Sequence, residues 1–158
     1  MGNEMSTNSY TATIEVTKPP GDVFDGITAI TKWWVQPAGD FEGRSTTLDD
    51  EFVIRHGDVH YSRQKLVEVV PDKKLVWLIT ESKLTWLQRD PHGWTDTRLV
   101  FELTPRGDKT VIRFTHQGLV AGKECYERVE QSWNIVIKKW LYDFITHGAP
   151  RPPPPGSV

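Results

Sequence analysis

The chain has 158 residues, a length that fits one domain able to bury a sizeable core without a disulfide or a metal. Nineteen basic and 21 acidic residues give a formal net charge of −2, and no basic run occurs, so no nucleic-acid partner is expected. The 37% hydrophobic and 25% charged residues are ordinary values for a globular protein and do not indicate a disordered or membrane-embedded chain.

Cysteine usage and hydropathy bound the cellular environment. Cys125 is the only cysteine, so no internal disulfide is possible, which favours a reducing, cytoplasmic location. No apolar run approaches the roughly 20 residues of a membrane-spanning helix, so membrane insertion is not expected. Residues 1–9 are polar and are predicted to form a flexible leader.

The first structured segment alternates with period two. Residues 10–17 place Ala12, Ile14 and Val16 on one side, which predicts a half-buried strand. A proline pair then precedes a predicted short helix at 20–28, which Gly26 should weaken. A second short helix is predicted around residues 30–35.

The middle of the chain predicts a set of antiparallel strands joined by tight turns. Residues 37–50 are loop-like, and residues 83–97 give no clear pattern beyond the turn signal at 90–93. The predicted strands are 51–56, 59–70, 74–80, 98–104 and 110–116.

The last element has helical periodicity. Between residues 124 and 146, apolar residues recur at steps of three and four, which predicts one amphipathic helix that covers a sheet. These residues are Val129, Trp133, Val136, Ile137, Trp140, Leu141 and Phe144. We therefore predict an α+β fold at residues 10–148, a curved antiparallel sheet of about six strands wrapped around this helix. Residues 149–158 form a Pro-rich tail predicted to be extended.

Motif searches favour binding over catalysis. The sequence contains no G-x-S-x-G, Walker A, G-x-G-x-x-G or H-E-x-x-H pattern, so no catalytic residue and no cofactor is assigned. His56 and His60 flank Gly57-Asp58, and a two-residue hairpin loop there would pair His56 with Val59 and turn His60 to the opposite face. No metal site is therefore predicted.

His116 is the polar residue of most interest. It shares a strand face with Ile112 and Phe114, so its ring should point to the concave side of the sheet. There it serves as a hydrogen-bonding group in a pocket, as an acid or base, or as a core histidine with satisfied hydrogen bonds. The core histidine is the favoured interpretation, because no carboxylate or nucleophile can be placed beside it. Cys125, in the first helical turn, has no partner group either and is expected to be a packed or idle thiol.

Seven tryptophans are the most informative signal. Three are predicted to face the interior between sheet and helix, namely Trp77, Trp133 and Trp140. Four lie in short helices or connections that would form a rim, namely Trp33, Trp34, Trp86 and Trp94. Large aromatic rings around a concave sheet suit either a packed core or an apolar ligand pocket. The predicted ligand contacts are Trp33, Trp34, Trp77, Phe101, Phe114, His116, Trp133 and Trp140.

Several stretches resemble a known family: PPGDVFDGITAITKWW, VWLIT, RLVFELTPRGDKTVIRFTHQGL and ECYERVEQSWNIVIKKWLYDFITHGAP. They resemble the helix-grip (START-like, SRPBCC) superfamily, and within it the branch of homologues of the activator of the heat-shock protein 90 ATPase. The resemblance covers residues 10 to 150. It implies a cavity between the sheet and the long helix that holds lipids, steroids, polyketides or hormones in other members.

The leading functional hypothesis is a non-enzymatic binding protein for a small apolar or amphipathic molecule, acting as a monomer or homodimer. The alternative is a protein-interaction module, including a chaperone partner. The eukaryotic activators carry a further N-terminal domain, which the nine residues before the first predicted strand do not supply. A third hypothesis is a cyclase or hydrolase, which predicts that His116 meets a carboxylate or water in a cavity.

Overall fold

One antiparallel sheet organises the molecule. The computed structural model describes residues 9–34, 40–85, 92–118 and 124–147. Its seven strands lie in the order β1-β7-β6-β5-β4-β3-β2. They are β1 (Ser9–Val16), β2 (Asp40–Gly43), β3 (Glu51–His56), β4 (His60–Val70), β5 (Lys74–Leu84), β6 (Arg98–Arg106) and β7 (Lys109–Gln117).

The sheet has one strand more than the sequence predicted. β2 lies in the segment that was predicted as a loop, and it forms an edge strand that pairs Phe41 with Ile54 of β3. Its four residues are too few to show a period-two pattern, which is why the sequence did not indicate it. β5 also continues four residues beyond its predicted end at Thr80, into the segment whose sequence gave no pattern.

Period-two alternation holds in the central strands. In β7, Ile112, Phe114 and His116 are fully buried on the inner face, while Arg113 and Gln117 are exposed. The register places Phe101 of β6 directly opposite Phe114. Both rings therefore point into the space between sheet and helices, as the pattern predicted.

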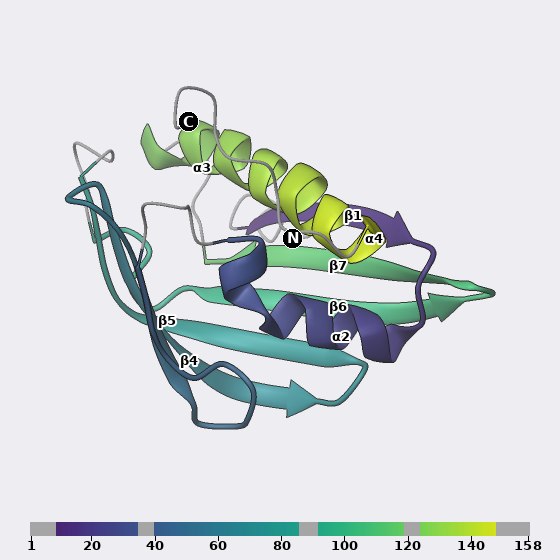
Figure 1. Ribbon diagram of the computed structural model, residues 1–158. Coiled ribbons are helices and arrows are strands. Elements are labelled where there is room, and N and C mark those ends of the chain that lie inside the picture. Colours follow the sequence, from purple (N-terminus) through teal and green to yellow (C-terminus); the bar gives the residue numbers. More distant parts are fainter. Residues whose placement is uncertain (1–8, 35–39, 86–91, 119–123, 148–158) are drawn as a thin grey trace, which may run out of the picture.

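The helices lie on one face of the sheet (Figure 1). α2 (Pro20–Thr28) and the 3-10 turn η1 (Ile30–Lys32) follow β1, and the C-terminal helix comprises α3 (Glu124–Ile135), η2 (Val136–Leu141) and α4 (Tyr142–His147). In Figure 1, β4 and β5 curve upward at the end of the sheet that faces α3. The C-terminal helix is continuous, as predicted, and its middle segment η2 has π-helical geometry.

Gly26 explains how α2 fits beneath the C-terminal helix. A Cβ atom at this position would lie 3.0 Å from Ile145 Cγ1 and 3.7 Å from Phe144 Cε2, both in α4. The glycine that weakens α2 as an isolated helix therefore permits the close approach of α2 to α4. This contact closes one end of the interior.

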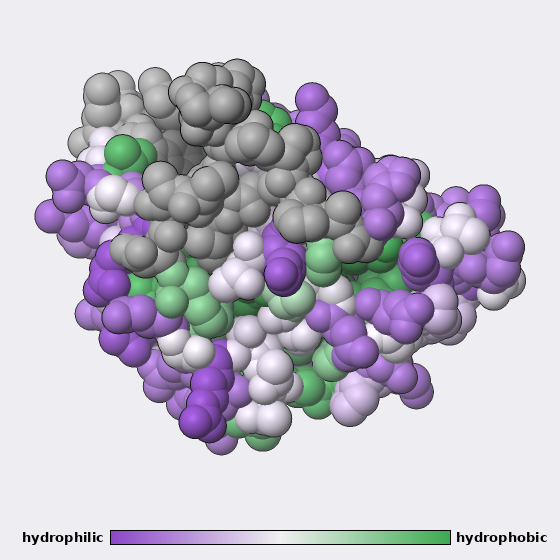
Figure 2. Space-filling view, in the orientation of Figure 1, coloured by the Kyte–Doolittle hydropathy of each residue, from purple (hydrophilic) through white to green (hydrophobic). Residues whose placement is uncertain are grey.

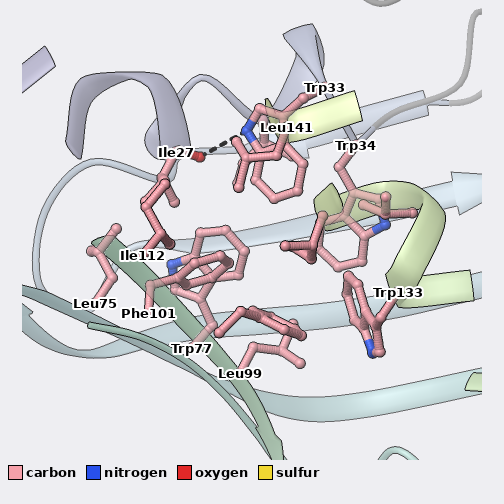
Figure 3. Packing of buried hydrophobic residues seen from close by; sticks show 14 of the residues in the cluster. Ile27, Trp33, Trp34, Leu75, Trp77, Leu99, Phe101, Ile112, Trp133 and Leu141 are labelled. Carbon is pink, nitrogen blue, oxygen red and sulfur yellow. Dashed lines mark hydrogen bonds between the residues drawn. The ribbon is translucent and has the colours of Figure 1, made fainter. Parts of the chain in front are cut away.

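The core consists largely of aromatic and branched side chains (Figure 3). Trp33, Trp77 and Phe101 have at most 1% of their surface exposed. Trp33 Nε1 donates to the Ile27 carbonyl at 3.1 Å, which satisfies the polar end of a fully buried ring. Phe101 packs against Trp77 at 4.8 Å and against Phe114 at 5.0 Å between ring centres.

Charged side chains form ion pairs on the exposed surface of the sheet. Arg63 lies between Glu51 and Glu81 at 3.3 Å from each, and Arg55 pairs with Glu42 at 3.0 Å. On the face shown in Figure 2, hydrophobic residues form small separate areas among hydrophilic ones. None of the helices in the described part of the chain has both the length and the apolar character needed to cross a bilayer.

Candidate ligand-binding site

An apolar hollow of about 500 Å³ lies between the β3–β4 hairpin and the C-terminal helix, and it is open to solvent on one side. Its size is within the range of small-molecule sites. The described residues that line it include four tryptophans and no Asp, Glu, Lys or Arg. They are Trp34, His56, Val59, His60, Trp94, Gln131, Ser132, Trp133, Ile135, Val136 and Trp140.

The floor of the hollow is a set of packed indole rings. Trp94 and Trp133 are stacked, with ring centres 5.6 Å apart and planes inclined by 14°. Trp34 lies 5.4 Å from Trp133 and stacks at 6.1 Å on Trp77, which belongs to the fully buried core (Figure 3). The hollow is therefore an open continuation of the aromatic core, and its floor is held by rings that are themselves packed from behind.

His116 lies beneath this floor and is hydrogen-bonded to it. The Trp133 indole N–H donates to His116 Nδ1 at 3.0 Å, so Nδ1 carries no proton. His116 Nε2 must then carry the hydrogen and donate to Thr97 Oγ1 at 2.8 Å, and Thr97 Oγ1 in turn donates to the Trp94 carbonyl. The ring connects the segments that carry the two stacked tryptophans, and both of its nitrogens are occupied.

Burial lowers the pKa of His116 from its usual 6.5 to about 3, so the ring is neutral at physiological pH. Among the described residues, its hydrogen-bond partners are Thr97 and Trp133, and no carboxylate is among them. The ring faces the concave side, as predicted, but it lies beneath the hollow and is absent from its lining. Its geometry is that of a core histidine that positions Trp133.

The hairpin between β3 and β4 differs from the prediction. Its loop comprises Gly57, Asp58 and Val59, and His56 pairs directly with His60. The predicted two-residue loop was wrong: Gly57, which has a positive φ, begins a loop of three residues. That extra residue places the two imidazoles on the same face, where both line the hollow.

His60 is held by a short polar chain. Its Nε2 lies 2.9 Å from Ser62 Oγ, which lies 2.6 Å from the Gln64 side-chain amide. With the amide oxygen turned toward Ser62, Gln64 also donates to the carbonyls of Ser62 and Phe52 at 3.2 Å each. Burial, with a smaller contribution from the charge of His56, lowers the pKa of His60 to about 3.

The π-helical segment η2 affects the outer wall. π-helical turns are rare and occur frequently at functional sites. Val136 at its start is buried and lines the hollow, whereas Trp140 is only half-buried and forms part of the wall. The wider π-helical turn allows Trp140 to line the hollow while Ile137 and Leu141 remain buried in the core.

The structure divides the predicted site residues into two groups. Trp34, Trp133 and Trp140 line the hollow. The others are buried behind or beneath it and do not line it: Trp33, Trp77, Phe101, Phe114 and His116. Trp86 and the side chain of Cys125 lie outside the part of the chain that the structure describes.

Other lining residues were not among the predicted contacts. Trp94 was predicted only as part of a rim, and Ile135 lies off the apolar stripe of the helix, where a single exposed apolar side chain does not indicate a binding surface. His60 gave no usable signal, because its direction depends on the length of the hairpin loop. Among the described residues, no group of three or more His, Cys, Asp or Glu side chains is placed to hold a metal ion.

A curved antiparallel sheet that holds a long C-terminal helix and leaves an apolar hollow at one end defines a helix-grip protein. Residues 17–142 match the family model described as activator of Hsp90 ATPase homolog 1-like protein. The chain therefore belongs to the activator of Hsp90 ATPase homolog 1-like family, as its resemblance implied. No curated protein sequence matches it significantly.

Solved structures agree with this fold. The solution structure of the Aha1 dimer from Colwellia psychrerythraea aligns with a TM-score of 0.71 and 19% identity, over 89% of this chain and 97% of that one. CalU16 from Micromonospora echinospora aligns with a TM-score of 0.63 and 16% identity, over 87% and 75%. An HSP90 activator from Plasmodium falciparum aligns with a TM-score of 0.53 and 14% identity, over 87% and 93%. At these identities the likeness establishes the fold alone.

Proposed function

We propose that this protein is a non-enzymatic binding protein for a small apolar or amphipathic molecule, held in the hollow between the β3–β4 hairpin and the C-terminal helix. The observation that carries the proposal is the composition of the lining, which is four indole rings with a few polar groups and no carboxylate, ammonium or guanidinium group among the described residues. Such a lining disfavours a strongly charged ligand, because desolvating a charge without a partner is costly.

Within this proposal, Trp34, Trp133 and Trp140 contact the ligand. Trp33, Trp77, Phe101 and Phe114 support those rings from the core, and His116 fixes the orientation of Trp133 through its hydrogen bond. Polar ends of an amphipathic ligand would face Gln131, Ser132 and the two imidazoles of the hairpin. We place the protein in the cytoplasm, as its single cysteine suggests.

Native mass spectrometry of the freshly purified protein tests the proposal first. A defined extra mass of a few hundred daltons that is lost on denaturation supports a ligand carrier. Titration with lipids and polycyclic aromatic compounds, followed by tryptophan fluorescence, then measures affinity. A bare mass together with no fluorescence response to the whole panel would refute the proposal.

A matched pair of variants separates binding in the hollow from general surface adsorption. Ile135 is 45% exposed and lies on the rim, whereas Leu48 is 55% exposed and does not line the hollow. Ile135→Glu places a carboxylate at the mouth and is expected to weaken ligand binding at least tenfold, while Leu48→Glu is expected to leave it unchanged. Equal effects of the two substitutions would contradict binding in the hollow.

The alternative function is protein interaction, including contact with a chaperone. Two observations favour it, the membership of the Hsp90-activator family and the exposed side chains of Val59 and Ile135 on the rim. The purified chaperone's ATPase rate, measured with and without this protein, tests the alternative. If this protein stimulates the ATPase and Val59→Glu abolishes the stimulation, the result would support protein interaction. An unchanged ATPase rate at saturating protein would count against it.

The oligomeric state, monomer or homodimer, stays a prediction that analytical sedimentation can test.

A further inference from the structure

We propose that His56 and His60 form a binding site for one divalent transition-metal ion at the rim of the hollow, with one imidazole nitrogen from each ring as ligands. The proposal goes beyond the binding of an apolar molecule and does not depend on it. Water, or a donor atom of a molecule in the hollow, would complete the coordination.

The cross-strand register provides the first argument. His56 and His60 are directly opposite each other on adjacent antiparallel strands, and their ring centres are 5.4 Å apart. A metal ion about 2.1 Å from an imidazole nitrogen lies about 3.2 Å from the ring centre, so two rings at a tetrahedral angle have centres about 5.2 Å apart. The observed separation of 5.4 Å therefore matches that expected for two rings that share one ion.

The hydrogen bonds of His60 provide the second argument. Metal-binding histidines commonly donate their other ring N–H to an outer partner, which fixes the tautomer. When Ser62 Oγ donates to the Gln64 amide oxygen, it must accept from His60 Nε2–H. The lone pair is then on Nδ1, which receives no hydrogen bond within the described part of the chain.

The chemistry of the two side chains limits the metal ions that would fit the site. Imidazole nitrogens suit Zn²⁺, Cu²⁺ and Ni²⁺, whereas Mg²⁺ and Ca²⁺ prefer oxygen ligands.

The other three histidines provide internal controls. His116 uses both ring nitrogens in the core, and His92 Nδ1 already contacts the Ser82 carbonyl at 2.6 Å. His147 is exposed at the end of α4. None of the three lines the hollow.

The tryptophans beside His60 provide the readout. Its ring centre lies 5.5 Å from Trp94 and 6.3 Å from Trp34, so Ni²⁺ bound there should quench their fluorescence. The full-length protein without a histidine tag is titrated with Ni²⁺ at neutral pH, and Zn²⁺ is then added as a competitor. We expect saturable quenching with one equivalent of Ni²⁺ and its reversal by Zn²⁺.

Variants identify the ligands. Loss of one of the two protein ligands should lower the affinity for Ni²⁺ by about 100-fold, so His56→Ala should abolish the saturable quenching. His92→Ala and His147→Ala should retain it. Wild-type protein that shows no saturable quenching, or His56→Ala with unchanged affinity, would overturn the proposal.

A second measurement does not depend on variants that might alter folding. In histidine ring spectra of the wild-type protein, substoichiometric Ni²⁺ should broaden the signals of His56 and His60 and spare those of His92, His116 and His147. Broadening confined to His92 or His147 would contradict the site. Uniform weak broadening of all exposed rings would show adventitious binding and would equally refute it.

Discussion

The two ends of the space between sheet and helices contain similar side chains but differ in how completely they are closed. At the α2 end, Trp33 donates to the Ile27 carbonyl of α2, and Trp33 and the adjacent Phe101 are fully buried. At the hairpin end, Trp140 is half-buried in the wall of an open hollow. The difference comes from coverage, since α2 packs on α4 and on β6 and β7 at the first end. Aromatic composition creates the potential for a pocket, and the placement of a short helix decides where one remains.

The largest expected effect is in the closed end. Phe101→Ala removes a ring that packs on Trp77 and Phe114, and it should lower the free energy of unfolding by about 3–5 kcal/mol. Urea unfolding monitored by circular dichroism measures the change. A decrease in the free energy of unfolding below about 1 kcal/mol would mean that the closed end is no more tightly packed than the open end.

Acidification should destabilise the hairpin end through two buried histidines, His60 in the lining of the hollow and His116 beneath its floor. The pKa values of His60 and His116 are about 3 in the folded protein and near 6.5 when unfolded. Between these values the unfolded chain binds more protons, so stability is complete above pH 6.5 and is lost as the pH falls toward 3. From pH 7 to pH 5, each ring should contribute a loss of about 2 kcal/mol.

Urea unfolding of His60→Gln and His116→Gln at pH 7, 6 and 5 checks this expectation. Each variant should show a smaller loss on acidification than the wild type. A variant of a buried ring that retains the full wild-type dependence would show that this ring is already protonated in the folded protein.

The contact that closes the α2 end should tolerate little added volume. Gly26→Val pushes two methyl groups toward Ile145, whose Cγ1 lies 3.0 Å from the position of the new Cβ, and should cost about 2 kcal/mol. Asp25→Val introduces the same side chain on the exposed side of α2 and serves as the control. Thermal unfolding of both variants measures the difference, and equal melting temperatures would show that α2 does not pack tightly on α4.

The smallest effect on stability is expected at the open end. Trp140 is half-buried in the wall of the hollow, so Trp140→Ala should cost about 1 kcal/mol or less while ligand affinity falls markedly. Parallel urea unfolding and ligand titration separate the two properties. A large loss of stability without a change in affinity would identify Trp140 as a core residue and weaken the proposed site.

The strands with several alternating residues could be predicted from the sequence, because each position on a strand is assigned to one face by period two alone. The inward direction of Ile112, Phe114 and His116 followed from this rule. β2 could not be predicted, since four residues with Phe41 as the only large apolar side chain become a strand only by pairing with β3. The role of Gly26 was equally hidden, because a glycine lowers helix propensity regardless of what lies beside it.

For the site, the amino-acid sequence by itself determined the kind of side chain and the face of each regular element, including the indole rings that surround the interior. It did not determine which rings remain accessible, because that depends on where α2 and the C-terminal helix cover the sheet. It also gave the wrong relation between His56 and His60, because one additional residue in a hairpin loop reverses the face of every residue that follows. The tertiary structure decided both points, since loop length and helix placement follow from contacts between residues far apart in the chain.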